Sequence, residues 1–109
     1  MTTTFKGTPI ILAGQFPQAG DDAPAFYLVR DDMSEFTLKD GKGHYLILNI
    51  FPSLDTGVCA TTVRRFNKMA ASLPGALVLC ISKDLPFAQQ RFCTTEGLDY
   101  VIPLSDFRY

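Results

Sequence analysis

Apolar runs and amphipathic stretches alternate through the second half of the chain. The near-continuous apolar runs at residues 45–51, 76–81 and 100–104 are typical of strands buried on both faces of a sheet. Between the first two runs, apolar side chains recur at helical spacing at Val63, Phe66, Ala70 and Leu73. A second helical pattern follows at Phe87, Ala88, Arg91 and Phe92. The sequence therefore predicts a β-α-β-α-β unit with right-handed crossovers, an α/β fold.

Residues with special backbone preferences mark the ends of both predicted helices. Pro74 and Gly75 follow the first helix and should end it. Before the second helix, Asp84 is expected to act as the N-cap, and Pro86 suits the first turn, where the N–H that proline lacks has no helical partner. Gly97 should end this helix. These signals place each helix between two of the apolar runs.

The first half of the chain has the pattern of short strands joined by turns. Residues 2–12 contain two β-rich runs about Gly7, which predicts an N-terminal β-hairpin. Residues 25–29 and 36–38 are expected to form two more strands on either side of a polar turn at residues 31–34. The sequence thus predicts that the α/β unit is preceded by short strands joined by turns.

The composition narrows the class of protein. The 109 residues are 47% hydrophobic and 19% charged, with a formal net charge of −1, which fits one globular domain over residues 1–109. The basic excess of nucleic-acid-binding proteins is absent from this composition. The apolar stretch at residues 9–14 is too short for a signal peptide or a membrane span. We expect a cytoplasmic protein with no nucleic-acid or membrane partner, the periplasm being the alternative location.

The three cysteines point to redox chemistry. Their number is odd and no two have CxxC spacing, which argues against a structural disulfide framework or a metal site. Cys80 lies inside an apolar run and is expected to be an inert core thiol. The isolated His44, at the entrance to a predicted strand, is expected to have no chemical role.

Cys59 lies where an apolar strand should turn into a helix. In a first helical turn the backbone N–H groups have no intrahelical acceptors, so a thiolate is favoured there. Pro52 fixes its own backbone torsion, and the Thr56 hydroxyl can donate to a thiolate or accept from a bound hydroxyl. The alternative is that Cys59 is a small buried apolar residue. The loop between residues 52 and 59 is therefore a candidate pocket for a small oxygen substrate.

The spacing Pro-x-x-x-Thr-x-x-Cys, at Pro52, Thr56 and Cys59, matches the signature of the peroxiredoxins. Residues 48–60 and 80–93 together resemble the thiol peroxidase branch, the bacterial atypical two-cysteine peroxiredoxins, and the resemblance extends over essentially the whole chain. It implies a thioredoxin-like fold with an N-terminal hairpin, and an enzyme that reduces hydrogen peroxide and organic hydroperoxides.

The resemblance also implies roles for individual residues. Cys59 would attack the peroxide and become a sulfenic acid, with Thr56 hydrogen-bonding in the pocket and Pro52 shielding it from water. Cys93 occupies the position of the family's resolving cysteine, and the resulting Cys59–Cys93 disulfide would be reduced by thioredoxin. The alternative for Cys93 is a helix cysteine without function. No metal or cofactor is required, and related proteins form homodimers.

The two helical cysteines are not expected to meet without movement. A disulfide needs Cα atoms about 4.4–6.8 Å apart, and residues in the bodies of two separate helices do not generally satisfy that limit. The sequence therefore predicts local unwinding around Cys59, around Cys93 or around both during the reaction cycle.

The chain also departs from the family pattern. The family domain continues beyond the position of Tyr109 with further strands, a terminal helix and an arginine beside the reactive thiol, so we expect a fold incomplete at its C-terminus. Arg64, Arg65 and Arg91 match other positions of the family. An incomplete sheet should expose an unpaired edge. Two alternative functions follow: a peroxide-responsive redox sensor or adaptor, and an inactive truncated fragment that associates through its exposed edge.

Overall fold

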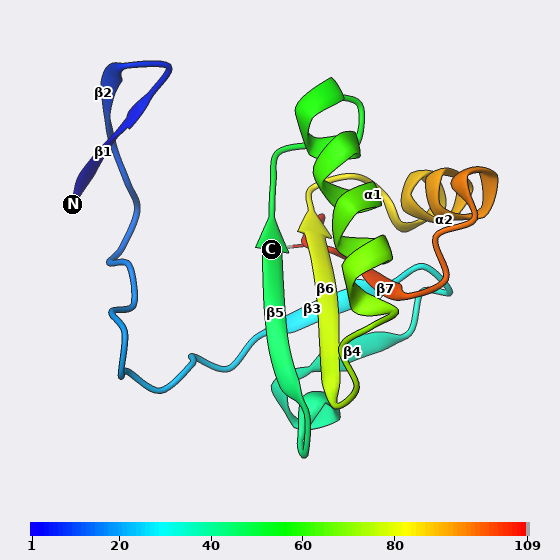
Figure 1. Ribbon diagram of the computed structural model, residues 1–109. Helices are drawn as coiled ribbons and strands as arrows, with labels where there is room; N and C mark the ends of the chain where they lie inside the picture. The colour runs from blue at the N-terminus through cyan, green and yellow to red at the C-terminus, as the bar shows by residue number, and fades with distance from the viewer. Residues whose placement is uncertain (109) are drawn as a thin grey trace.

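The computed structural model describes residues 1–108 and contains a five-stranded sheet of order β4-β3-β7-β6-β5 (Figure 1). The strands are β3 (Tyr27–Arg30), β4 (Glu35–Thr37), β5 (Tyr45–Ile50), β6 (Ala76–Ser82) and β7 (Val101–Ser105). Helix α1 (Gly57–Ala70) joins β5 to β6, and helix α2 (Pro86–Glu96) joins β6 to β7. The predicted β-α-β-α-β unit and the α/β class are confirmed.

The parallel strands β5, β6 and β7 lie side by side in chain order, with Asn49 opposite Cys80 and Cys80 opposite Pro103. Because both right-handed crossovers step the same way across the sheet, both helices pack on one face. In Figure 1, α1 lies over β6, with β5 uncovered beside it. The carboxyl ends of the three strands meet at one edge of the sheet, where α/β folds generally place their ligand sites.

The two faces of the sheet carry separate apolar clusters, because side chains alternate along each strand. The face under the helices contains a cluster that includes Leu54, Val63, Val78, Cys80, Cys93, Leu98 and Val101. The other face contains a cluster of Leu28, Phe36, Leu79, Ile81 and Leu104. Val63 and Cys93 come from α1 and α2, so the helices share one core with the parallel strands.

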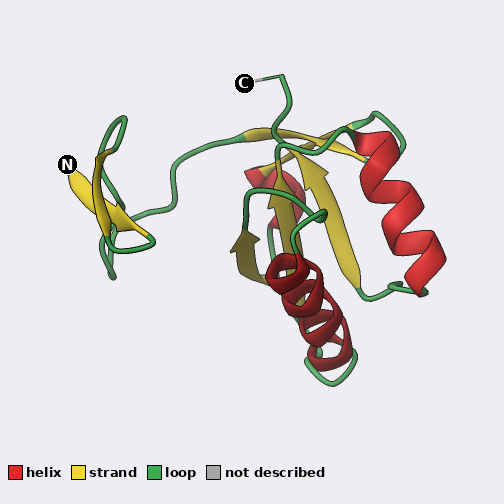
Figure 2. Ribbon diagram, turned by 90° about the horizontal axis from the view of Figure 1, so that it is seen from above, coloured by secondary structure: helices red, strands yellow, loops and turns green. Residues whose placement is uncertain are grey.

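The predicted N-terminal hairpin is present, as β1 (Thr2–Phe5) paired antiparallel with β2 (Thr8–Ile11). It forms a sheet of its own, and both views show it set apart from the five-stranded sheet (Figure 1, Figure 2). Gly7 in its turn has a φ of +82°, a left-handed conformation that glycine adopts without strain. The strands predicted at residues 25–29 and 36–38 correspond to β3 and β4, although Leu38 belongs to the short 3₁₀ helix η1 (Leu38–Gly41).

Two local predictions for α2 were wrong. The N-cap residue of α2 is Leu85, and the Asp84 side chain makes no cap hydrogen bond because it accepts bonds from other segments. The buried face of the helix is also different: Phe87 is 64% exposed, whereas Gln89 and Cys93 are buried. Gln89 is buried because its amide donates to the Ser82 hydroxyl and to the carbonyl of Leu104.

Strand β5 is an edge of the sheet within residues 1–108, since it pairs with β6 only. Leu48 and Ile50, on the face that the helices leave uncovered, are 43% and 70% exposed. The exposed edge predicted from the sequence is therefore present in the described part of the chain. None of the helices described is long and apolar enough to cross a membrane.

Candidate active site

Cys59 is the third residue of α1, in the first turn of the helix as the sequence predicted, and it is partly exposed. The strand β5 ends at Ile50, and six loop residues lead to the start of the helix at Gly57. Within residues 1–108, the N–H groups of Gly57, Val58 and Cys59 have no hydrogen-bond acceptor. These three donors and the helix dipole give the first turn the partial positive charge that stabilises an anion.

Thr56 is the N-cap residue of α1, with an extended backbone (φ −95°, ψ 137°). Its hydroxyl donates to the carbonyl of Ser53 at 3.0 Å, so the same oxygen remains an acceptor for a neighbouring donor. Its carbonyl accepts the helical hydrogen bond from the N–H of Ala60. Both Thr56 and Pro52 are exposed. The roles expected of them in a peroxide pocket stay predictions.

The first turn of α1 carries extra hydrogen bonds from two threonines. The hydroxyls of Thr61 and Thr62 donate to the carbonyls of Gly57 and Val58, each at 2.9 Å. Hydroxyls bonded back to the carbonyl four residues earlier compete with the helical N–H for that acceptor and weaken or bend a helix slightly. These bonds therefore slightly lower the cost of unwinding the turn that holds Cys59.

Cys93 lies in the core, 8% exposed, packed in the cluster under the helices. Burial raises the pKa of its thiol to about 12, and the negative fields of Cys80, Asp31 and Asp99 add to the increase. A shallow cleft of about 230 Å³ passes its position and is also lined by Asp31 and Asp99. Cys93 is thus held as a neutral thiol, the less nucleophilic form.

Cys80 in β6 is also buried, as expected of an inert core thiol. Burial raises its pKa to about 11, although the amide of Asn49 donates to the sulfur at 3.8 Å and acts in the opposite direction. All three cysteines are free thiols. Cys80 and Cys93 share a cluster that does not include Cys59, and no disulfide joins Cys59 to Cys93 in this conformation.

Alkaline pH is expected to destabilise the protein through its buried thiols. Folding raises the pKa of Cys93 to about 12 from an ordinary 9.0, so the fold favours the neutral thiol. The contribution of the neutral Cys93 thiol to the free energy of unfolding is complete below pH 9.0. It is lost as the pH rises towards the pKa of Cys93 in the folded protein, about 12. The loss approaches about 1.4 kcal/mol per pH unit in that interval.

Urea unfolding of the wild type and of Cys93→Ala, at about pH 8 and about pH 10.5, measures this loss. The free energy of unfolding should fall further in the wild type than in the variant. Because each protein is compared with itself at two pH values, the destabilisation caused by the cavity that the substitution leaves cancels from the comparison. An equal fall in both proteins would contradict the burial of Cys93 as a neutral thiol.

Arg64 connects the two helices that carry Cys59 and Cys93. Its guanidinium pairs with Glu96 of α2 at 2.6 Å and lies over the ring of Phe92, 5.5 Å from the centroid. The hydrogen bond from Arg64 holds the pKa of Glu96 below its usual value. This guanidinium is therefore engaged between the helices, in line with the sequence-based view that Arg64 does not take the place of the family arginine.

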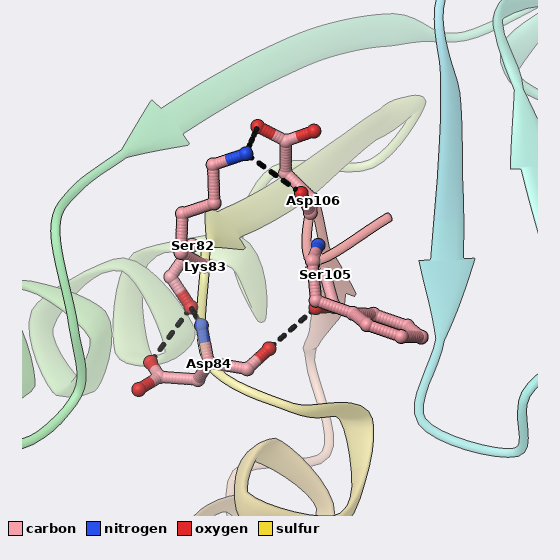
Figure 3. A network of polar contacts seen from close by, with 6 residues as sticks. Ser82, Lys83, Asp84, Ser105 and Asp106 are labelled. Carbon is pink, nitrogen blue, oxygen red and sulfur yellow. Dashed lines mark hydrogen bonds and ion pairs between the residues drawn. The ribbon is translucent and has the colours of Figure 1, made fainter. Parts of the chain in front are cut away.

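Asp84 is the residue near the site whose role the sequence did not indicate. It lies at the carboxyl edge of the sheet, between Ser82 of β6 and Ser105 of β7 (Figure 3). Burial acts to raise the pKa of its carboxyl, but hydrogen bonds from Ser53, Leu54 and Ser82 outweigh it and lower the pKa. Its partners are far from it in sequence except for Ser82, so no local motif could identify them.

Metal-binding geometry is not found among residues 1–108, where no three His, Cys, Asp or Glu side chains are grouped so as to hold an ion. His44 is exposed.

A parallel strand followed by a loop, and a cysteine in the first turn of the next helix, are typical of a thioredoxin-like redox fold. The chain belongs to the Redoxin family, which matches residues 18–109. The match begins after the hairpin β1–β2.

Among curated proteins, the thiol peroxidase of Corynebacterium glutamicum is 55% identical over 106 residues, which are 97% of this chain and 64% of that protein. A peroxiredoxin-like protein from Aquifex aeolicus has a crystal structure that superposes with a TM-score of 0.90 at 40% identity, over 99% of this chain and 63% of that one. The resemblance to thiol peroxidases inferred from the two cysteine segments is thus confirmed.

A thiol peroxidase from Chromobacterium violaceum shares the fold, with a TM-score of 0.82 at 24% identity over 98% of this chain and 63% of that one. The thioredoxin-like fold expected from the sequence is confirmed by these structures. The chain spans a little under two thirds of the length of the relatives it matches.

Proposed function

We propose that the protein is a thiol-dependent peroxidase that reduces hydrogen peroxide and organic hydroperoxides through Cys59. The observation that carries the proposal is the position of Cys59 in the first turn of α1, beside three backbone N–H groups without acceptors in the described structure. Such a turn stabilises the thiolate that attacks and the negative charge that develops on the departing oxygen. The 55% identity to a thiol peroxidase supports the same chemistry.

In the proposed first step, the Cys59 thiolate attacks the distal oxygen of the hydroperoxide. The sulfur–oxygen bond forms as the oxygen–oxygen bond breaks, and the departing oxygen takes a proton to leave as water or an alcohol. Cys59 becomes a sulfenic acid. The Thr56 hydroxyl, already donating to Ser53, would accept a hydrogen bond from the bound peroxide. Pro52 would limit the access of water to the loop.

In the second step, the Cys93 thiol condenses with the sulfenic acid, and a disulfide and one water are formed. Thioredoxin would then reduce the Cys59–Cys93 disulfide by two thiol exchanges, which returns both cysteines to thiols. No bound metal or cofactor takes part in either step. We further propose that the chain forms a single thioredoxin-like domain of a cytoplasmic homodimer.

A peroxide-responsive redox sensor is the second candidate function. The observation that favours it is the burial of Cys93, because a resolving thiol held in the core delays disulfide formation and gives the Cys59 sulfenic acid a longer lifetime. In a sensor, the change of shape that accompanies disulfide formation would be read by a protein partner.

The number of turnovers separates the two candidates. Hydrogen peroxide consumption is followed with thioredoxin, thioredoxin reductase and NADPH in excess. A peroxidase consumes many equivalents per chain, and a sensor consumes about one. The longer thiol peroxidase of C. glutamicum serves as the positive control. Turnover by that enzyme, together with no oxidation of Cys59 in the 109-residue chain, would contradict the proposal for this chain.

A further inference from the structure

The carboxylate of Asp84 joins two segments that carry the reactive cysteines. Asp84 follows β6 and precedes α2, the helix of Cys93. Its two oxygens accept hydrogen bonds from the Ser53 hydroxyl at 2.6 Å and from the Leu54 N–H at 2.8 Å. Both donors belong to the loop that leads into α1 and Cys59. The carboxylate therefore holds this loop against the start of α2.

The other end of this connection is fixed to the sheet. The Ser82 hydroxyl donates to Asp84 at 2.7 Å, and the Gln89 amide donates to the Ser82 hydroxyl at 3.0 Å. The Ser105 hydroxyl of β7 donates to the backbone carbonyl of Asp84 (Figure 3). Contacts with β6, α2 and β7 thus hold Asp84 in place, and the loop is the part that can move.

Besides Asp84, the loop is anchored at Phe51 and at Leu54. The Phe51 N–H donates to the carbonyl of Ile81 at 3.1 Å, and its side chain packs against the cluster under the helices. Leu54 inserts into the cluster that also contains Cys93. The Thr56 hydroxyl and N–H both return to the carbonyl of Ser53 within the loop itself. Pro52, Asp55 and Thr56 are exposed. Loss of the Asp84 contacts would leave residues 52–56, between Phe51 and the start of α1, held to the body mainly through the Leu54 side chain.

We propose that Asp84 is a positioning residue for the peroxide reaction, acting on Cys59 through Ser53 and Leu54, an inference that rests on the proposed function. The carboxylate keeps the first turn of α1 in the conformation that reacts with peroxide. Release of the same contacts frees the loop and Leu54, and so opens the core around Cys93 for disulfide formation. Asp84 thereby favours the first step and opposes the second.

The variant Asp84→Asn tests the proposal, because the amide keeps the size of the side chain but presents a donor where three donors converge. Stopped-flow measurement should show Cys59 oxidation about tenfold to a hundredfold slower. The first-order rate constant for disulfide formation should be unchanged or higher. Unchanged oxidation together with a lower melting temperature would assign Asp84 a structural role only and overturn the proposal.

Two further variants sharpen the comparison. Ser53→Ala removes one of the loop donors and should give a smaller decrease in the rate of Cys59 oxidation. In the double variant with Asp84→Asn, Ser53→Ala should cause little further decrease in the rate of Cys59 oxidation, because both substitutions break the same contact. Asp106→Asn is the matched control: it removes the ion pair with Lys83 next to Asp84 without touching the loop, and both rate constants should stay within about twofold.

Hydrogen exchange without peroxide separates this proposal from the proposed function. The Leu54 amide donates to Asp84, so its exchange should be about tenfold or more faster in Asp84→Asn than in the wild type. Wild-type protein that fails to react with peroxide would contradict the proposed function but not the attachment of the loop. Equal Leu54 exchange in both proteins would overturn the positioning role whatever the activity.

Discussion

Replacing Cys59 with serine is expected to abolish peroxide reduction, lowering the rate by on the order of 10³-fold or more. A serine hydroxyl fits the site but does not ionise near neutral pH, so the first turn of α1 has no nucleophile to stabilise. The other two thiols cannot replace it, because Cys80 and Cys93 are buried and burial raises the pKa of both. The measurement is peroxide consumption under single-turnover conditions, with mass spectrometry of each cysteine.

The matched control is Cys80→Ala, which removes a thiol of the same chain from the core of the sheet. The only side-chain hydrogen bond of the Cys80 sulfur within residues 1–108 comes from the amide of Asn49, so the fold should tolerate the change. Peroxide consumption by Cys80→Ala should match that of the wild type within about twofold. If Cys59→Ser still consumed peroxide and Cys80→Ala did not, the nucleophile would be Cys80 and the proposed mechanism would be wrong.

The sheet and its two crossovers could be predicted because periodicity is a local signal. Buried parallel strands appear as short continuous apolar runs, and α1 has a clear stripe that includes Val63 and Phe66. The position of Cys59 followed from the same pattern, since the end of β5 and the start of α1 are both visible in the sequence. The place of Cys59 in the fold was therefore accessible without a structure.

The orientation of α2 could not be predicted in this way. A polar residue, Gln89, lies at the centre of its buried face, while the apolar Phe87 faces outward. An apolar stripe locates a core face only when packing alone decides which residues are buried, and here hydrogen bonds from Gln89 to Ser82 and Leu104 decide it. For the same reason, the burial of Cys93 was not evident from its neighbours in sequence.

The contacts of Asp84 lie beyond sequence reasoning for a different reason. Ser53 and Leu54 approach Asp84 only because β5 and β6 are adjacent parallel strands whose carboxyl ends coincide. Once that topology is known, polar residues directly after neighbouring strands are expected to meet. The sequence alone predicts the simpler role of a helix N-cap for Asp84, and this prediction is wrong because the N-cap residue is Leu85.

Replacement of Cys93 by serine is expected to leave one oxidation per chain and to abolish turnover with thioredoxin. The first step needs only Cys59, which is partly exposed in the first turn of α1. The second step needs a thiol that is 8% exposed and lies in a cluster without Cys59. We therefore expect disulfide formation to require local unwinding around one or both cysteines, at a rate set by that opening.

Opening is feasible at both cysteines. Thr61 and Thr62 weaken the helical bonding of the first turn around Cys59. Around Cys93, the side chains of the Arg64–Glu96 ion pair are 45% and 35% exposed, so the pair contributes little resistance to movement of α2 relative to α1. In Cys93→Ser the sulfenic acid formed at Cys59 has no partner, and it should persist or oxidise further.

Mass spectrometry after one equivalent of peroxide gives the decisive comparison. The wild type should contain the Cys59–Cys93 disulfide with Cys80 free, and Cys93→Ser should contain a Cys59 sulfenic acid that reacts with dimedone. Cys80→Ala controls for the loss of a core thiol and should cycle normally with thioredoxin. Normal cycling by Cys93→Ser would show that another thiol reacts with the sulfenic acid. Cys93 would then be an ordinary buried core residue, and not a thiol that becomes reactive when the helix opens.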